Sequence, residues 1–272
     1  MRVALKVAYL GDNYYGFQRQ PEVPTVEAEI KEALEKIGVP EGKFGYAGRT
    51  DRGVDALGQV IDFEIGDDKE ALTYPRPING RLPRDVWTWA RSLVPENFDS
   101  RYSALWREYL YILYHQGLDM DVVRSGARKL LGEHDFRNFS SCKEDTVREI
   151  LGLEVRVKSP NIAVFQIKAN GFLWNMVRKI VCSLEAVGSG EMDLSWIDDL
   201  LNPEINEGAP TAPAEGLILK GVGYEGISWQ VDDYSRKRAA KALSSVVKRR
   251  MASSYAVKAL LDSMTSSFDC FL

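Results

Sequence analysis

One order of expected elements occurs twice along the chain, and this repetition constrains the fold more than any other feature. In the first half, alternating apolar residues predict strands at 3–9 and 59–65, and further strands are expected at 43–49 and at 85–93, which is rich in Val and Trp. A helical period follows Thr25, Gly38 is placed to end that helix, and residues 67–82 are expected to be partly helical. The first half therefore reads β-α-β-β-α-β.

The second half repeats this order, with one extra short helix. Strands are expected at 105–114, 149–157, 161–169 and 216–223, and helices at 119–131, 172–187 and 194–201. Two β-α-β-β-α-β halves predict a ferredoxin-like α+β fold, in which a large, mostly antiparallel sheet carries helices on one side. We expect an active-site cleft between the halves. The expected units are 1–100, 101–230 and a basic helical extension at 231–272.

The charge of the chain is unevenly distributed. Its 272 residues are 45% hydrophobic, enough for real cores, and the formal net charge is −4, which argues mildly against a nucleic-acid partner. From Ser228 onward, however, eight Lys and Arg residues face four Asp residues. Such an asymmetry is typical of an RNA-contacting surface, and equally of a solvated amphipathic helix.

Cysteine and histidine usage argues against a metal site. Cys142, Cys182 and Cys270 are scattered without a CxxC pair, and His115 and His134 form no ligand cluster. We therefore expect neither structural zinc nor a disulfide framework, and a reducing cytoplasm fits best. No apolar run reaches membrane-spanning length, and the N-terminus lacks the apolar centre and cleavage site of a signal peptide.

The sharpest local feature is the turn GRTDRGVDALGQV at 48–60, where glycines bracket polar residues between two expected strands. Glycine permits unusual backbone angles and the close approach of a ligand, so Asp51 can face a pocket. Arg49 lies two residues before Asp51, and pairing with it would orient the carboxylate as a nucleophile or base. The same residues also suit a plain tight hairpin, and the turn by itself does not decide between the two.

Several stretches beside this turn resemble the tRNA pseudouridine synthase A (TruA) family, in which the catalytic Asp lies in a GRTDxGV context. The resemblance runs in family order from residue 9 to about 224. The matching stretches are YGFQRQ (15–20), TVE (25–27), INGRLP (78–83), FDSRYSA (98–104), GEHDF (132–136), ANGFLWNMVR (169–178) and APAEGL (212–217).

This resemblance implies a two-domain α+β fold with a large mixed sheet, no metal, no cofactor and a homodimer. It also implies that the enzyme isomerises uridine to pseudouridine in the anticodon arm of tRNA, at positions 38 to 40. The target base must then leave its stack to be reached.

The resemblance also assigns roles to individual residues. Asp51 would attack ribose C1′ or uracil C6, or act as the base of a glycal route, and Arg49 would orient it or fill the space of the flipped base. Tyr109 would stack on uracil and assist proton transfer. Arg178 would be a second cation near Asp51. The substrate-binding candidates are Arg19, Arg81, Arg101, Arg148 and Gln59.

The chain departs from the family pattern at three positions. Phe17 replaces Trp, Asp55 stands where many members have His, and Glu108 replaces a basic residue. We interpret His134 and Asp135 as structural caps, because no second histidine is available for acid–base work.

Two other functions remain open at this point. A non-catalytic RNA-binding protein on the same scaffold would read bases with Tyr109 and Tyr111. A carboxylate hydrolase would need a second carboxylate, for which Asp55 is the close candidate.

Overall fold

The computed structural model describes residues 1–39 and 42–266. The first half contains β1 (Arg2–Tyr9), η1 (Gly11–Asn13), α1 (Val26–Lys36), β2 (Phe44–Tyr46), β3 (Asp55–Glu64), η2 (Asp67–Thr73), α2 (Pro75–Asn79) and β4 (Val86–Val94). The second half contains β5 (Ala104–Tyr114), α3 (Met120–Lys129), β6 (Gly132–Asp135), η3 (Arg137–Phe139), β7 (Val147–Ser159), β8 (Ile162–Ala169), α4 (Met176–Gly188), α5 (Trp196–Leu201), η4 (Ala214–Gly216) and β9 (Leu217–Tyr224). The chain continues through β10 (Gln230–Val231) into the long helix α6 (Asp233–Ser266).

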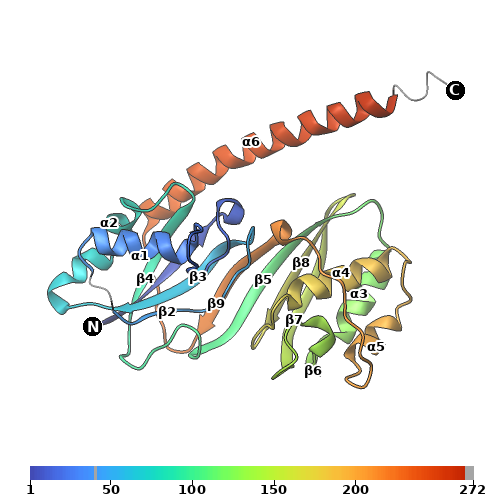
Figure 1. Cartoon of the computed structure of the whole chain (residues 1–272), viewed down its shortest axis with the longest axis horizontal. Helices are drawn as coiled ribbons and strands as arrows, with labels where there is room; N and C mark the ends of the chain where they lie inside the picture. The colour runs from blue at the N-terminus through green and yellow to red at the C-terminus, as the bar shows by residue number, and fades with distance from the viewer. Residues whose placement is uncertain (40–41, 267–272) are drawn as a thin grey trace.

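Both halves join in a single sheet with the order β10-β4-β1-β3-β9-β5-β8-β7-β6, and β2 also pairs with β3 (Figure 1). The orders β4-β1-β3-β2 and β9-β5-β8-β7 are the same arrangement repeated. Neighbouring strands are antiparallel except at the junction of the halves, where β3 and β9 run parallel. The expected α+β class with a large, mostly antiparallel sheet is confirmed.

The junction between the halves is short and closely packed. Asp55 pairs with Ile218 and Ala56 with Leu219. Beyond this point Gly58 lies against β9, because a Cβ built there would come within 2.5 Å of the Lys220 carbonyl oxygen. A residue with a side chain would push the halves apart, so glycine is required here for close approach rather than for backbone freedom.

The helices divide between the two faces of the sheet. Helices α1 to α5 contribute buried residues to one large core, which also contains Val7 of β1. Successive strand side chains point to opposite faces. The next residue, Ala8, instead packs with Trp87 of β4 and Ala239 of α6 in a separate small cluster. The first part of α6 therefore covers the other face of β1 and β4.

Several expected boundaries shift in the structure. β3 begins at Asp55 rather than at residue 59, and α4 begins at Met176 rather than at residue 172. The cause in α4 is Asn175, whose left-handed backbone (φ 66°) cannot belong to a right-handed helix. The GEHDF stretch was not expected to be a strand, yet it forms β6 against β7. Within it, His134 contacts the Leu131 carbonyl as a cap does, whereas Asp135 instead accepts a bond from the following Arg137 amide.

Candidate active site

A cleft of about 980 Å³ opens between the two halves, and the turn that carries Asp51 forms part of its wall. Five arginines line it, against two aspartates, Asp51 and Asp145. These arginines are Arg49, Arg101, Arg107, Arg148 and Arg178. The lining is thus positive in a chain whose net charge is −4. A positive concave surface concentrates a polyanion such as RNA.

The Asp51 turn is fixed by the first half of the chain. The Thr50 side chain shares a 2.7 Å hydrogen bond with the buried Tyr9 hydroxyl, and the Thr50 carbonyl accepts the Phe17 amide at 3.0 Å. Gly16 permits this second contact. Its φ is +103°, and a Cβ there would lie 2.8 Å from the Thr50 oxygen. The YGFQRQ stretch therefore packs against the backbone of the Asp51 turn and holds it in place.

The Asp51 carboxylate receives its partners from the second half. Arg178 Nη1 lies 3.3 Å from Oδ2, and Trp174 Nε1 donates to Oδ1 at 3.3 Å. Arg178 is itself held, since its Nε donates to the Ala212 carbonyl at 2.7 Å and its Nη1 to Asn175 Oδ1 at 3.1 Å. The Asp51 side chain remains 37% exposed and Arg178 18%. The carboxylate is therefore oriented and also open to the cleft.

The expected pairing of Arg49 with Asp51 is wrong in this structure. Arg49 lies in the cleft wall with its side chain exposed, and no hydrogen bond or ion pair joins it to Asp51 within the described residues. Arg178 takes that place because the first turn of α4 points its guanidinium at the carboxylate, whereas the turn directs Arg49 into solvent. Arg49 is left available to an incoming ligand.

Tyr109 lies on β5 in the cleft wall and is 9% exposed. Its ring packs edge-on against Phe172, with ring centroids 5.0 Å apart. Burial raises the pKa of Tyr109 to about 12, which Arg107 opposes and Asp51 reinforces. The hydroxyl therefore stays protonated at neutral pH and is able to donate a hydrogen bond to a ligand.

Arg107 is a site residue that the sequence reasoning missed. Its guanidinium donates to three main-chain carbonyls, namely Ala47 at 3.0 Å, Asn170 at 3.3 Å and Arg101. These carbonyls belong to the three loops that carry Asp51, Trp174 and Tyr102. One side chain thus fixes the three loops relative to one another. The available signal was its place two residues before Tyr109, to which the resemblance assigns a role. Trp174 was also missed, although it lies in the quoted ANGFLWNMVR stretch.

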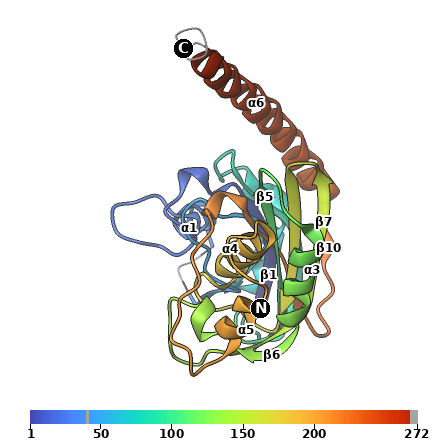
Figure 2. The ribbon, with the colours of Figure 1, turned by 90° about the vertical axis from the view of Figure 1, so that its right-hand side faces the viewer.

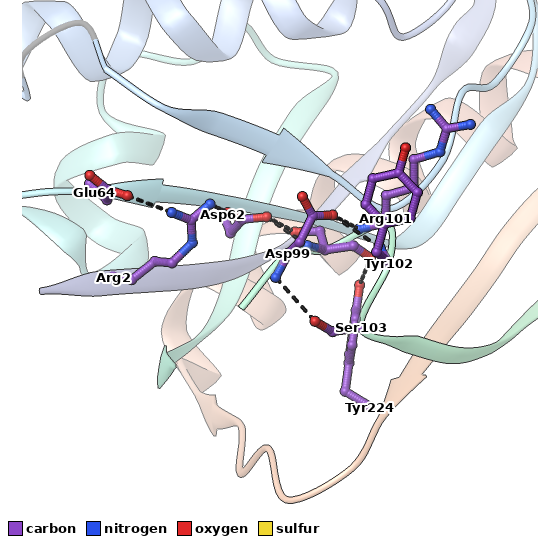
Figure 3. Close-up of polar contacts among 9 residues, drawn as sticks. Arg2, Asp62, Glu64, Asp99, Arg101, Tyr102, Ser103 and Tyr224 are labelled. Carbon is purple, nitrogen blue, oxygen red and sulfur yellow. Dashed lines mark hydrogen bonds and ion pairs between the residues drawn. The ribbon is translucent and has the colours of Figure 1, made fainter. Parts of the chain in front are cut away.

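A buried polar network supports the loop that presents Arg101 and Tyr102 to the cleft (Figure 3). Asp62 of β3 is fully buried, forms an ion pair with Arg2, and accepts bonds from the Ser100 amide and hydroxyl. Asp99 then accepts the Arg101 amide at 2.8 Å and the Tyr102 amide at 3.0 Å. The buried Asp62 carboxylate therefore holds the loop that links the two halves, and this loop presents Arg101 and Tyr102 to the cleft.

The other expected substrate-binding residues lie in different environments. Arg101 and Arg148 line the cleft, where Arg148 pairs with Asp145 at 3.2 Å. Arg19 and Arg81 are exposed but do not line it. The expectation that Gln59 contacts the substrate directly is wrong in this structure, because its side chain is fully buried. Gln59 Nε2 instead donates to the Gly48 carbonyl at 2.8 Å and supports the Asp51 turn.

Asp55 is not a second carboxylate of the cleft. Its Oδ1 accepts the Gly11 amide at 2.7 Å, and burial raises the pKa of its carboxyl. Among residues 1–39 and 42–266, no group of three or more His, Cys, Asp and Glu side chains is placed to hold a metal ion. In the same part of the chain, no helix has both the length and the apolar character needed to cross a membrane.

Comparison with known proteins identifies the class first. The profile of a family described as tRNA pseudouridine synthase matches residues 127–225. Together with relatives that match most of the chain, this match places it among the pseudouridine synthases, enzymes that isomerise uridine in RNA. A tRNA pseudouridine synthase A from Methanothrix thermoacetophila is 52% identical over 98% of this chain and 100% of its own length. A second, from Methanocella arvoryzae, is 46% identical over 88% of this chain and 90% of its own length. The chain belongs to the tRNA pseudouridine synthase A family.

The likeness to solved structures is distant. An archaeal box H/ACA sRNP Nop10–Cbf5 complex matches 67% of this chain and 52% of its own, with 12% identity and a TM-score of 0.35.

Proposed function

We propose that the enzyme isomerises uridine in the anticodon stem-loop of tRNA, at positions 38 to 40, and that Asp51 is the catalytic carboxylate. The observation that supports this proposal is the position of Asp51. It is the acidic side chain that the GRTDRGV turn places in an arginine-lined cleft, oriented by Arg178 and Trp174 and still open to a ligand.

The reaction breaks the N1–C1′ bond of uridine and makes a C5–C1′ bond. The proton on C5 is lost and a proton returns to N1, so atoms balance without an oxidant or reductant. Asp51 acts either as the nucleophile at C1′ or C6, or as the base that starts a glycal route. The neutral Tyr109 hydroxyl is suited to carrying a proton beside it, and its ring to lying against uracil.

The arginines of the cleft have supporting roles in this proposal. Arg101 and Arg148 contact phosphates of the bound arm, and Arg49 occupies the space that the flipped base leaves. Arg19 and Arg81 lie outside the cleft and would contact RNA that extends beyond it.

The proposal includes a cytoplasmic homodimer with two halves at 1–100 and 101–230 in each subunit. Family resemblance supports the dimer. The free thiols of Cys142 and Cys182 fit a reducing compartment, and Cys270 lies outside the described residues. Light scattering after gel filtration measures the oligomeric state directly.

The catalytic assignment is tested with Asp51→Ala and Asp51→Asn. We expect both variants to bind unmodified tRNA about as tightly as the parent and to release no tritium from C5-labelled uridine. Asp55→Asn is the matched control, because Asp55 lies on the same segment but bonds to Gly11 outside the cleft lining. Full tritium release by Asp51→Ala would remove the assignment.

The position of the modified uridine is a separate measurement. Carbodiimide-blocked primer extension on tRNA treated with the parent enzyme maps each new pseudouridine. Stops confined to another arm of the tRNA would overturn the anticodon-arm proposal and leave the catalytic role of Asp51 standing.

A further inference from the structure

Helix α6 has a charge that sets it apart from the rest of the chain. Between Asp233 and Ser266 it carries eight Lys and Arg residues and two Asp residues, whereas the whole chain has a net charge of −4. The helix rises beyond the body of the protein (Figures 1 and 2). Its charge therefore belongs to a projecting arm.

One face of α6 is committed to the body. Ala239 is buried against Ala8 and Trp87, and Leu243 packs at the edge of the same cluster. Further along the same face, Arg250 forms an ion pair with Asp12 of η1. The spacing of Ala239, Leu243 and Arg250 follows the period of about 3.6 residues of a single helical face.

This anchoring places α6 near the catalytic turn. Asp12 is next to Gly11, whose amide is bonded to Asp55 at 2.7 Å, four residues after Asp51. In Figure 2, α6 begins on the side of the sheet opposite α1 and α4. Toward its C-terminus the helix slants over to the side on which α1 and α4 lie. The cleft opens on that side, because the first residues of α4 line it.

A second face of α6 carries basic side chains that have no acidic partner in the described part of the chain. Lys237, Arg238, Lys241, Lys248 and Arg249 are exposed, and within the described residues none of their side chains makes an ion pair or hydrogen bond. At about 1.5 Å per residue, these basic residues span about 18 Å along the helix. Cations without acidic partners do not stabilise the fold through ion pairs, and a row of them on a helix favours binding to a polyanion.

We propose that this basic face of α6, formed by Lys237, Arg238, Lys241, Lys248 and Arg249, is a second RNA-binding surface that contacts the phosphate backbone of the tRNA outside the cleft. The inference rests on the proposed binding of a tRNA arm in the cleft and adds a separate contact. The contact made by α6 does not recognise a base sequence, because lysine and arginine contacts to phosphates position RNA without distinguishing bases.

The experiment uses full-length protein and unmodified tRNA transcript, with the five residues changed together to Gln. The control variant carries five Gln substitutions at basic residues outside both α6 and the cleft lining, at Lys36, Arg124, Arg128, Arg156 and Lys158. Binding is measured across potassium chloride concentrations. Both sets are repeated with Asp51→Ala, so that the result does not depend on turnover.

We expect the α6 variant to bind tRNA at least tenfold more weakly than the parent at about 0.1 M salt. Its slope of log K against log salt should become shallower by about 0.7–0.9 for each phosphate that the variant no longer neutralises. KM should rise with the dissociation constant, while kcat at saturating tRNA stays within twofold. The control variant should match the parent in slope.

An unchanged slope in the α6 variant would overturn the inference. An equal fall in both variants would also overturn it, since general charge would then explain the effect. If the α6 variant instead loses a subunit in light scattering at an unchanged salt slope, the face is a protein contact and the RNA assignment is wrong.

Discussion

The Arg178 guanidinium lies 3.3 Å from the Asp51 carboxylate, although the two residues are 127 positions apart and belong to opposite halves of the chain. Neither half contains a complete site. The turn after β2 supplies the carboxylate, and the first turn of α4 supplies its cation. The orientation of Asp51 therefore depends on how the sheet joins the two halves.

Replacing Arg178 by Gln should lower the single-turnover rate about 10- to 100-fold. A hydrogen bond to a charged group is worth about 1.5–3 kcal/mol, and this one orients the carboxylate. The rate of Arg178→Lys should lie between those of the parent and Arg178→Gln, because lysine keeps the charge but loses the Nε bond to Ala212. Lys179→Gln is the control, since Lys179 follows on α4 without lining the cleft. A parental rate in Arg178→Gln would show that Asp51 does not need this cation.

Replacing Tyr109 by Phe separates the ring from the hydroxyl. Phe preserves the edge-on contact with Phe172, so KM should change by less than about threefold. Loss of a positioned proton donor should lower kcat by about 10²-fold or more. Rapid-quench kinetics on tRNA measure both quantities. If instead KM rises while kcat is unchanged, Tyr109 serves binding alone.

The buried Tyr109 also predicts a loss of stability at alkaline pH. Its pKa is raised to about 12 in the folded state, above the ordinary value near 10. The folded protein therefore holds a proton that the unfolded chain releases, and this contribution is present below pH 10 and lost as pH rises toward 12. The free energy of unfolding should fall about 1.4 kcal/mol less per pH unit in Tyr109→Phe than in the parent over that range. Urea unfolding at several pH values measures the difference, and equal slopes would contradict the prediction.

The network around Asp62 allows two ion pairs of the same guanidinium to be compared. Arg2 pairs with the fully buried Asp62 and also with Glu64, whose side chain is 56% exposed. Asp62→Asn should cost about 3–5 kcal/mol of unfolding free energy, because it leaves the buried Arg2 charge without its main partner. Glu64→Gln should cost less than about 1 kcal/mol. Chemical denaturation of both variants tests this, and similar losses would mean that burial of the pair is unimportant.

Gly58→Ala should disturb the junction of the two halves. The new methyl would meet backbone atoms of β9 at 2.5 and 2.8 Å, which cannot move as a side chain can. We expect a loss of about 1–3 kcal/mol in stability, as for other overpacked sites, together with lower activity. Gly152→Ala on β7 is the control, because nothing lies within 4 Å of the added methyl. Gly58→Ala with parental stability and rate would show that the junction tolerates separation.

Much of this architecture was accessible to sequence reasoning. Alternation in residues 3–9 and 59–65, together with helical periods that end at glycine, depends on interactions between near neighbours. The GRTDRGV turn was recognisable for the same reason. By contrast, β6 was missed because its pairing with β7 outweighs the weak pattern of four residues.

The sequence by itself determined two similar β-α-β-β-α-β halves and singled out Asp51 as the candidate carboxylate, because strand alternation, helical period and turn composition are local properties. Only the tertiary structure decided that Arg178 rather than Arg49 holds that carboxylate, that Gln59 is buried, and that Arg107 joins three loops. These outcomes depend on contacts between distant residues, whose geometry is set by the packing of the halves and is not written in any short stretch of the chain.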